Sequence, residues 1–300
     1  MTIVTGAFSY SGKYLTKLLV ERGEPVRTLT GHPDRPNPFG SKVEVARMDF
    51  SDPDGLVEAM KGAHAFVNTY WIRFPYRGMT FERAVENSKL LFDAASRAGV
   101  GRIVHTSITN PSLQSPLGYY RGKAQVEEHL KATGIPFTIL RPNVIFGRED
   151  VLINNIAWVL RNLPLFGVPG SGKYGMQPTF VEDYAALMLA SLDAKGSETT
   201  DACGPEAFAF GDWVRRIAEA IGRPARIVHM PPSCAYWASA LLGTRMKDVV
   251  LTREEVRGLM SGMLVSTEPA KCSTKLSDWL SENAHWLGKD YANEVGRHFK

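Results

Sequence analysis

Thr5-Gly6-Ala7-Phe8-Ser9-Tyr10-Ser11-Gly12 follows a short apolar run, Thr2 to Val4, and precedes a segment from Lys13 to Leu19 with apolar residues at helical spacing. This order predicts a strand, a tight turn and a helix. Such a turn points backbone N–H groups and the positive end of a helix dipole at an anion, commonly a pyrophosphate. Gly6 would permit the sharp turn, and Gly12 the close packing of helix on strand. Because any tight β–α turn needs glycine, the rest of the chain has to distinguish a nucleotide site from a purely structural turn.

Strands alternate with helices through the first half of the chain. Apolar strands are predicted at residues 2–4, 25–30, 43–47, 65–69, 102–106 and 137–141, and helices at 13–19, from 53, at 81–98 and at 119–132. This alternation implies right-handed crossovers and an α/β fold with a doubly wound parallel sheet, the Rossmann arrangement. Residues 1–145 are therefore predicted to form a dinucleotide-binding domain.

The alternation loosens beyond residue 142. Helices are predicted at 151–163, 182–192, 213–221, 233–242, 254–260 and 276–299, the last with a break near Gly288, and an extended segment at 174–181. We expect residues 146–300 to form mainly a smaller, α-rich substrate lobe at the carboxyl edge of the sheet, interleaved with the sheet near 174–195.

Composition excludes several classes of protein. The apolar content of 44% is ample for a packed core, and the net charge of +4 comes from scattered residues, so no nucleic-acid partner is expected. The three cysteines, Cys203, Cys234 and Cys272, lie far apart, which fits neither a metal site nor a disulfide framework and favours a reducing compartment. The first strand starts almost at Met1, so we expect no signal peptide, and the uncharged run 231–244 is too short to span a bilayer. We expect a cytoplasmic protein without a transmembrane segment, in which this run is a buried or interfacial helix.

The second strand bears on the choice of cofactor. It closes on Thr30-Gly31, whereas NAD-specific folds place an acidic residue here to bind the ribose diol. His32 and Arg35 follow, and cations suit the 2′-phosphate of NADP. The sequence favours NADP, with NAD as an option and a solvated loop with incidental charges as the structural alternative.

A second motif, Tyr119-Tyr120-Arg121-Gly122-Lys123, contains candidate catalytic residues. Tyr119 and Lys123 are four residues apart and share one face of a helix, where the ammonium can lower the pKa of the tyrosine enough for acid–base catalysis. Ser107 and Thr109 follow the fifth strand, where a hydroxyl could polarise a substrate carbonyl. By itself, this tyrosine–lysine spacing also occurs on solvated helix faces.

Together these motifs resemble the short-chain dehydrogenase/reductase superfamily, in its extended and atypical branch. The resemblance is carried by residues 5–12, Asp49-Phe50, Ser107, Tyr119 with Lys123, and Leu140-Arg141-Pro142-Asn143. Within that branch, residues 141–150, Gln177-Pro178 and Val181-Glu182-Asp183 look like the NADPH-binding accessory subunits of respiratory complex I and NmrA-like or epimerase-like bacterial proteins. The resemblance covers residues 2–195 well and the C-terminal lobe loosely.

The resemblance implies a set of site residues. Tyr119 would be the catalytic acid/base, Lys123 its partner and a ligand of the cofactor, and Ser107 or Thr109 the catalytic hydroxyl. The cofactor would also be bound by Thr30, His32 and Arg35 of the loop described above. The pyrophosphate would lie at Gly6, Phe8, Ser9, Tyr10, Ser11 and Gly12, and the adenine at Asp49 and Phe50. The ribose would lie at Asn68, Thr69 and Tyr70, and the nicotinamide at Pro142, Asn143 and Val144.

The sequence departs from the family pattern at three positions. Ser9 replaces the middle glycine of the usual turn, which leaves the backbone less room to approach a phosphate. Gly31 stands where NADP-binding relatives often carry arginine, so the preference for NADP depends on His32 and Arg35. Ile108 occupies a position where sugar epimerases commonly have serine or threonine, which weakens the case for carbonyl polarisation.

Three functions follow from these observations. The first is an NAD(P)-dependent oxidoreductase that transfers a hydride to or from a small organic substrate. The second is a non-catalytic NADPH-binding sensor or assembly protein, suggested by the complex I resemblance and by the apolar run 232–238. The third is a nucleotide-sugar epimerase with tightly held NAD. The sequence leaves the substrate and the oligomeric state open, with a homodimer as one option.

Overall fold

The chain folds into two compact units in a computed structural model that describes residues 1–224 and 226–298. Unit 1 comprises Met1–Pro142 and Val181–Ala202, and unit 2 comprises Asn143–Phe180 and the chain from Cys203 onward. The polypeptide thus leaves unit 1 after residue 142 and returns to it for one helix and one strand.

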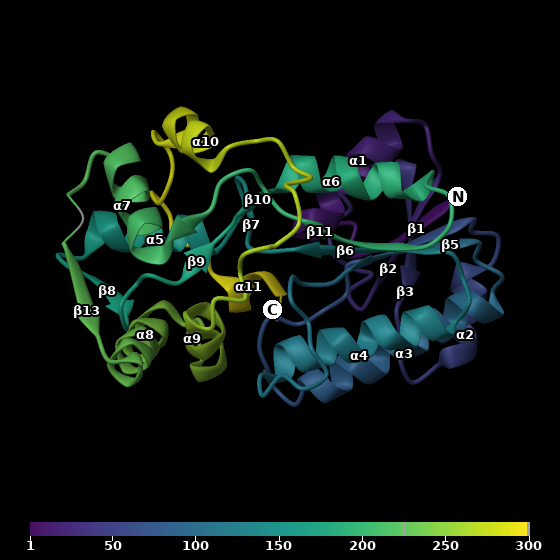
Figure 1. Cartoon of the computed structure of the whole chain (residues 1–300). Coiled ribbons are helices and arrows are strands. Elements are labelled where there is room, and N and C mark those ends of the chain that lie inside the picture. The colour runs from purple at the N-terminus through teal and green to yellow at the C-terminus, as the bar shows by residue number, and fades with distance from the viewer. Residues whose placement is uncertain (225, 299–300) are drawn as a thin grey trace. The chain divides into compact units, whose positions relative to one another are not determined.

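Unit 1 is built on a seven-stranded parallel sheet (Figure 1). Its strands are β1 (Thr2–Thr5), β2 (Val26–Thr30), β3 (Val43–Arg47), β4 (Ala65–Asn68), β5 (Arg102–Thr106), β6 (Phe137–Pro142) and β11 (Glu198–Ala202). They are ordered β11-β6-β5-β4-β1-β2-β3, so the direction of winding reverses between β1 and β4. This confirms the predicted doubly wound α/β fold. Strand β11, which the sequence analysis did not predict, extends the sheet by one strand beyond β6.

Helices cover both faces of this sheet. They are α1 (Tyr10–Glu21) and α6 (Val181–Leu192) on one face, and α2 (Pro53–Met60), α3 (Phe81–Arg97) and α4 (Gly118–Ala132) on the other (Figure 1). As predicted, α2 begins at Pro53, and the Asp52 side chain caps it by accepting a hydrogen bond from the Gly55 N–H at 2.9 Å. All four residues of β1 and of β4 are buried, which explains their continuous apolar runs.

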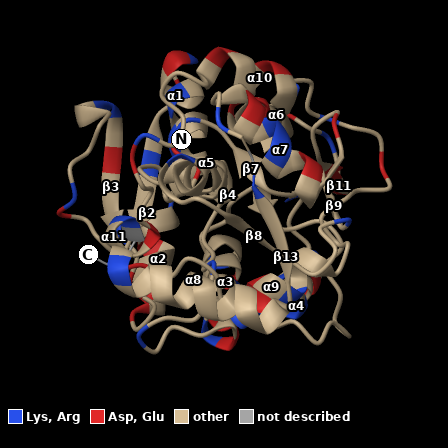
Figure 2. Ribbon diagram, turned by 90° about the vertical axis from the view of Figure 1, so that its left-hand side faces the viewer, with Lys and Arg blue, Asp and Glu red and all other residues tan. Residues whose placement is uncertain are grey.

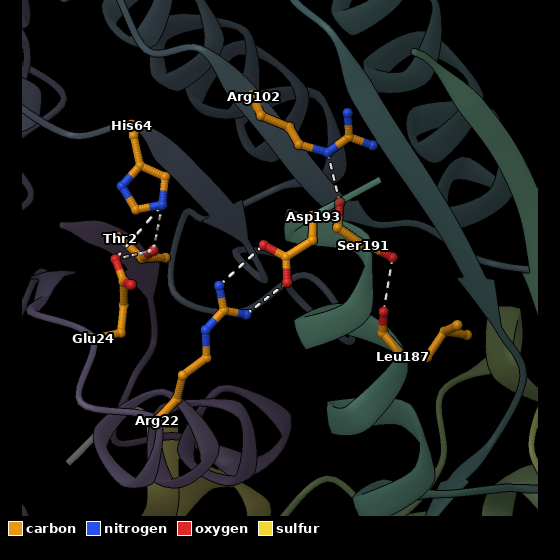
Figure 3. A network of polar contacts seen from close by, with 8 residues as sticks. All are labelled: Thr2, Arg22, Glu24, His64, Arg102, Leu187, Ser191 and Asp193. Atoms are coloured by element: carbon orange, nitrogen blue, oxygen red, sulfur yellow. Dashed lines mark hydrogen bonds and ion pairs between the residues drawn. The ribbon is translucent and has the colours of Figure 1, made fainter. Parts of the chain in front are cut away.

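A polar network fastens the returning segment to the rest of unit 1 (Figure 3). The buried guanidinium of Arg102, at the start of β5, donates to the carbonyl oxygens of Ser191 and Gly196 at 2.6 and 2.9 Å. A third donor of the same group reaches the Thr138 hydroxyl at 2.6 Å. At the surface, Arg22 after α1 pairs with Asp193 after α6, at 2.7 and 3.0 Å. These bonds hold the returning segment, α6 and β11, against the rest of unit 1, although residues 143–180 of unit 2 separate it from β6 in the sequence.

Unit 2 combines short strand pairs with helices around its own apolar core. Its pairs are β7 (Ile145–Phe146) with β10 (Thr179–Phe180), β9 (Gly175–Met176) with β12 (Phe208–Ala209), and β8 (Phe166–Pro169) with β13 (Ile227–Met230). Its helices are α5 (Leu152–Asn162), α7 (Phe210–Ala220), α8 (Pro232–Met246), α9 (Arg253–Met260), α10 (Leu276–Asn283) and α11 (Glu294–His298). The core contains Phe146, Trp213 and Trp279.

The predicted tail helix is two separate helices, α10 and α11, with a long break between them, and its last residue, Phe299, lies outside the described residues. Within the described ranges, no helix is long and apolar enough to cross a membrane.

Candidate active site

The turn after β1 has the geometry expected of a phosphate-binding turn. Gly6 has a φ of +70°, which favours glycine, and a Cβ added to Gly12 would overlap the Gly6 carbonyl oxygen. Both glycines are therefore needed for the helix to approach the strand. The N–H and hydroxyl of Ser9 both donate to the Gly6 carbonyl, at 2.9 and 2.8 Å. The serine at the irregular position of the motif thus closes the turn itself.

The segment after β4 is bonded to the end of β1. The Thr69 hydroxyl donates to the Thr5 carbonyl at 2.5 Å, and the Thr69 N–H donates to the Thr5 hydroxyl at 2.8 Å. The Thr5 hydroxyl in turn donates to the Asn68 side-chain oxygen at 3.1 Å. Since β1 and β4 flank the point where the winding reverses, these bonds place Asn68, Thr69 and Tyr70 beside the glycine turn, as a ligand crevice requires.

Asn68 also fixes the state of a buried histidine. Its side-chain oxygen accepts bonds from Thr5 and from the Tyr70 N–H, so its amide nitrogen is the donor to Nδ1 of His105 at 3.2 Å. This network assigns the proton of the neutral ring to Nε2. Burial, and secondly the charge of Lys123, hold the pKa of His105 well below its ordinary value. His105 is therefore a neutral imidazole at the centre of the sheet.

Lys123 is buried against the end of β5. Its ammonium donates to the Thr106 carbonyl at 2.7 Å and lies 4.5 Å from the centroid of the Trp71 ring. Burial lowers the pKa of Lys123 to about 7, while the negative charge of Glu127 acts in the opposite sense. Gly122 makes this packing possible, because an added Cβ would lie only 3.0 Å from Trp71. The lysine is thus a group that titrates near neutral pH.

Tyr119 lies among aromatic rings on the same helix. Its half-buried ring meets Trp71 and Phe81 edge to face, with centroids 5.9 and 5.8 Å apart. Trp71 is therefore a shared neighbour of Tyr119 and Lys123. The adjacent Tyr120 is buried, and burial raises its pKa to about 12. Only Tyr119 of this pair combines partial exposure with the register of the lysine.

The two predicted catalytic hydroxyls have acceptors inside the fold. Ser107 donates to the buried carboxylate of Glu127 at 2.5 Å, and Arg141 binds the same carboxylate at 2.5 and 2.9 Å. The hydroxyl of the buried Thr109 donates to the Arg141 carbonyl at 3.1 Å. The structure thus directs the Ser107 hydroxyl to α4 and the Thr109 hydroxyl to the backbone of β6. Glu127 was missed by the sequence analysis, although it lies one further turn along the face of Lys123.

The residues predicted at the adenine form a second cluster on the sheet edge. The Asp49 carboxylate accepts bonds from the N–H and hydroxyl of Ser51, at 3.0 and 2.6 Å, and these bonds lower its pKa. The Phe50 ring lies 5.2 Å from that of Tyr70. Tyr70 accepts a hydrogen bond from the Asn87 amide at 2.8 Å, and burial raises its pKa. Phe50 and Asn87 are thus both neighbours of Tyr70.

The loop after β2 is exposed where a 2′-phosphate is expected. The N–H of His32 donates to the Thr30 hydroxyl at 3.1 Å, and the N–H of Arg35 donates to the His32 carbonyl at 3.2 Å. Partial burial, and secondly the charge of Arg35, lower the pKa of His32. Phe8 in the glycine turn lies 6.4 Å from Phe39, ring to ring, so the turn and this loop are neighbours.

Three predicted nicotinamide residues divide between the units. Pro142 belongs to unit 1, where its carbonyl accepts from the Thr109 N–H at 3.2 Å. Asn143 and Val144 belong to unit 2; the buried Asn143 amide donates to the Cys203 sulfur at 3.2 Å, and the Val144 carbonyl accepts a backbone bond from β10 at 2.9 Å. The chain therefore passes between the units within the predicted motif.

Comparisons with known proteins give related matches. A family model described as NAD(P)H-binding matches residues 6–151. Subunit 9 of the NADH dehydrogenase [ubiquinone] 1 alpha subcomplex, mitochondrial, of Arabidopsis thaliana is 28% identical over 239 residues, 76% of this chain. The chain spans about three fifths of the length of this relative (60%) and of its mouse counterpart (59%). These matches confirm the resemblance drawn from the motifs.

Solved structures match almost the whole chain. Triphenylmethane reductase of Citrobacter sp., complexed with NADP(H), has a TM-score of 0.78 at 16% identity, over 94% of this chain and 99% of that one. A nucleoside-diphosphate-sugar epimerase of Staphylococcus aureus has a TM-score of 0.76 at 17% identity, over 93% and 99%. An NADPH-dependent quinone oxidoreductase of Escherichia coli has a TM-score of 0.72 at 19% identity, over 94% and 99%. At such identities these likenesses show the fold alone.

Proposed function

We propose that the protein is an NAD(P)H-dependent reductase with Tyr119 as proton donor, on the premise of the NAD(P)H-binding family model that matches residues 6–151. The observation that carries the proposal is the packing of Tyr119 and Lys123 against one ring, that of Trp71. A protein that only bound the cofactor would need no tyrosine in this register. We further propose NADP rather than NAD, because β2 closes on Thr30-Gly31 without a carboxylate and His32 and Arg35 follow.

The cofactor would lie at the carboxyl ends of β1 and β4, where the winding of the sheet reverses. Gly6 and Gly12 let α1 begin close to the end of β1, and the first N–H groups of α1 would face the diphosphate, as at any helix N-terminus. Asp49 and Phe50 would meet the adenine, and Asn68 to Tyr70 the ribose side. A reduced nicotinamide, when bound, supplies a hydride to the substrate.

Residues of the protein would supply the proton that accompanies hydride transfer. Tyr119 would give its phenolic proton to the substrate oxygen or carbon that gains electron density, and solvent would return it afterwards. The ammonium of Lys123, one helical turn away, lowers the free energy of the phenolate left behind. Phe81 and Trp71 exclude water from the other sides of the ring. Because the tyrosine stands among aromatic rings, we propose a flat, aromatic or quinone-like acceptor.

One observation favours a second candidate, a non-catalytic NADPH-binding component of a larger assembly. Ser107 and Thr109 bond to acceptors within the fold, so neither hydroxyl is directed at a substrate carbonyl. The relative from Arabidopsis thaliana is described as a subunit of NADH dehydrogenase, and as mitochondrial. A cytoplasmic location and a homodimer stay predictions for this chain.

A cofactor and substrate panel tests the proposal. The purified protein is mixed with NADPH or NADH, and nicotinamide absorbance is followed with quinones, aromatic aldehydes and triphenylmethane dyes. Multiple turnovers with at least one class, faster with NADPH, are expected. Tight NADPH binding with no oxidation by any acceptor would overturn the reductase proposal in favour of the second candidate. Conversion of UDP-glucose without net change in absorbance would identify the further alternative, an epimerase.

A further inference from the structure

Helix α8 exposes the two most accessible large apolar side chains of the described residues. Trp237 is 62% exposed and Leu241 is 75% exposed. They are one helical turn apart, and Cys234 and Ala238 on the same side are exposed as well. Arg245 is the single charged residue of the helix, which is drawn almost entirely tan in Figure 2. Contiguous exposed apolar surface of this kind marks an interaction site.

The inward side of α8 shows that this exposure is built into the helix. Its buried residues are the small ones, Ala235, Ser239 and Gly243, which recur every four residues. A Cβ added to Gly243 would lie 2.6 Å from the Asp248 carbonyl oxygen, so the helix packs closely on that side. A helix that only supported the core of unit 2 would turn its large apolar residues inward. Here Trp237 and Leu241 point outward instead, whereas Tyr236, Leu242 and Met246 are partly buried.

Basic side chains border the apolar stripe formed by Cys234, Trp237, Ala238 and Leu241. The Arg253 guanidinium, at the start of α9, lies 4.9 Å from the centroid of the Tyr236 ring and 5.8 Å from that of Trp237. Arg245 and Lys247 are exposed at the C-terminal end of α8. The stripe is therefore flanked by cations at one end and along one side.

Two of the three acidic residues in segment 232–260 are bonded inside the fold. Asp248 accepts bonds from the Tyr291 hydroxyl at 2.9 Å and from the backbone N–H groups of Glu294 and Val295 at 3.1 and 2.9 Å. Glu255 forms a capping box with Thr252. The same segment has four basic residues, so its outward charge is positive.

We propose that α8 lies in the plane of an anionic lipid surface. Trp237 and Leu241 would enter the boundary of the acyl chains, with Arg245, Lys247 and Arg253 at the level of the lipid phosphates. At about 1.5 Å per residue, a helix of 15 residues is too short to cross a hydrocarbon core of about 30 Å. A second copy is a poorer occupant, because a two-fold contact between α8 helices would bring the same cations together.

Vesicle sedimentation tests this proposal. The native protein is expected to sediment with vesicles of mixed phosphatidylcholine and phosphatidylglycerol, much less with pure phosphatidylcholine, and less as salt rises. The double variant Trp237→Ser, Leu241→Ser should lower the partition coefficient at least about tenfold, since it removes the apolar contact. Arg245→Glu should weaken binding to the anionic vesicles alone. Leu113→Ser, in unit 1, is the matched control for losing an exposed leucine and should bind as the native protein does.

A native far-ultraviolet circular dichroism spectrum and a near-native denaturation midpoint show that each variant is folded. Absence of native binding to either vesicle, or equal binding by the double variant, would overturn the proposal. Self-association of the native protein in sedimentation velocity, lost in the double variant and without vesicle binding, would overturn it in favour of a homodimer. If the native protein binds neither vesicle and specifically captures one protein through α8, the partner of α8 is a protein and the lipid proposal is wrong.

Discussion

At the scale of single residues, the glycine turn depends on Gly12. Its Cα faces the Gly6 carbonyl, so Gly12→Ala should force α1 away from β1 even though alanine favours the helix. We expect a loss of about 1–3 kcal/mol in the free energy of unfolding and at least a tenfold weaker affinity for NADPH. Denaturant titration and fluorescence titration with NADPH measure these two changes. Gly211→Ala, in unit 2, is the control, since an added Cβ there meets only ordinary contacts at 3.6 Å and beyond; equal behaviour of both variants would contradict the assignment of the turn.

His105 should make the protein sensitive to acid. Its pKa in the fold is well below the value of about 6.5 expected in the unfolded chain, so below that pH the unfolded state binds a proton that the folded state does not. The free energy of unfolding should therefore decrease as the pH is lowered below about 6.5, by up to about 1.4 kcal/mol per pH unit.

The variant His105→Gln should flatten that slope, whatever it costs in absolute stability. Urea titrations of both proteins between about pH 7 and pH 5 measure the slope. His129→Gln is the control, since His129 lies at the surface of α4 beside Asp93. An unchanged slope in His105→Gln would show that other groups cause the acid sensitivity.

At the scale of the elements, Arg102 joins β5 to the segment that returns from unit 2. Arg102→Met keeps the aliphatic stem but leaves the carbonyls of Ser191 and Gly196 without their donor. We expect a loss of about 2–4 kcal/mol, because buried acceptors lose their hydrogen bonds. Arg22→Met removes a neighbouring ion pair at the surface and should change the denaturation midpoint little. Similar effects of the two variants would argue against a special role for Arg102.

Strand β11 shows where prediction from sequence stops within the sheet. The six strands β1 to β6 could be predicted because the central ones are buried on both faces and contain short apolar runs, Ile3-Val4, Ala65-Phe66-Val67 and Ile103-Val104. β11, Glu-Thr-Thr-Asp-Ala, is a polar edge strand whose conformation is set by its pairing with β6, which no local pattern records. The two-residue strands of unit 2 are likewise products of tertiary pairing.

The candidate site divides in the same way. The spacing of Tyr119 and Lys123 predicted that they share a helix face, and both contact Trp71 in the structure. The role of Glu127 could not be predicted, because a glutamate four residues after a lysine is typical of a surface ion pair. Its burial comes from Arg141, which is close only in the fold. The sequence therefore predicted the pair, but not the network that surrounds it.

At the scale of the whole molecule, the fold alone does not determine the chemistry. Reductases and an epimerase have folds similar to that of this chain. The relative from Arabidopsis thaliana is a subunit of a larger enzyme. What distinguishes a reductase from a cofactor-binding component is whether Tyr119 moves a proton.

The most direct test compares Tyr119→Phe with Tyr120→Phe, using the best quinone or aldehyde from the panel, because reduction of these acceptors takes up a proton as well as a hydride. Each variant removes one hydroxyl from neighbouring positions of α4, but only Tyr119 shares Trp71 with Lys123. Tyr119→Phe should lower kcat about 10²–10⁴-fold while the Kd for NADPH changes less than about threefold, and Tyr120→Phe should keep kcat near the native value. A Tyr119→Phe protein with native kcat would contradict the account.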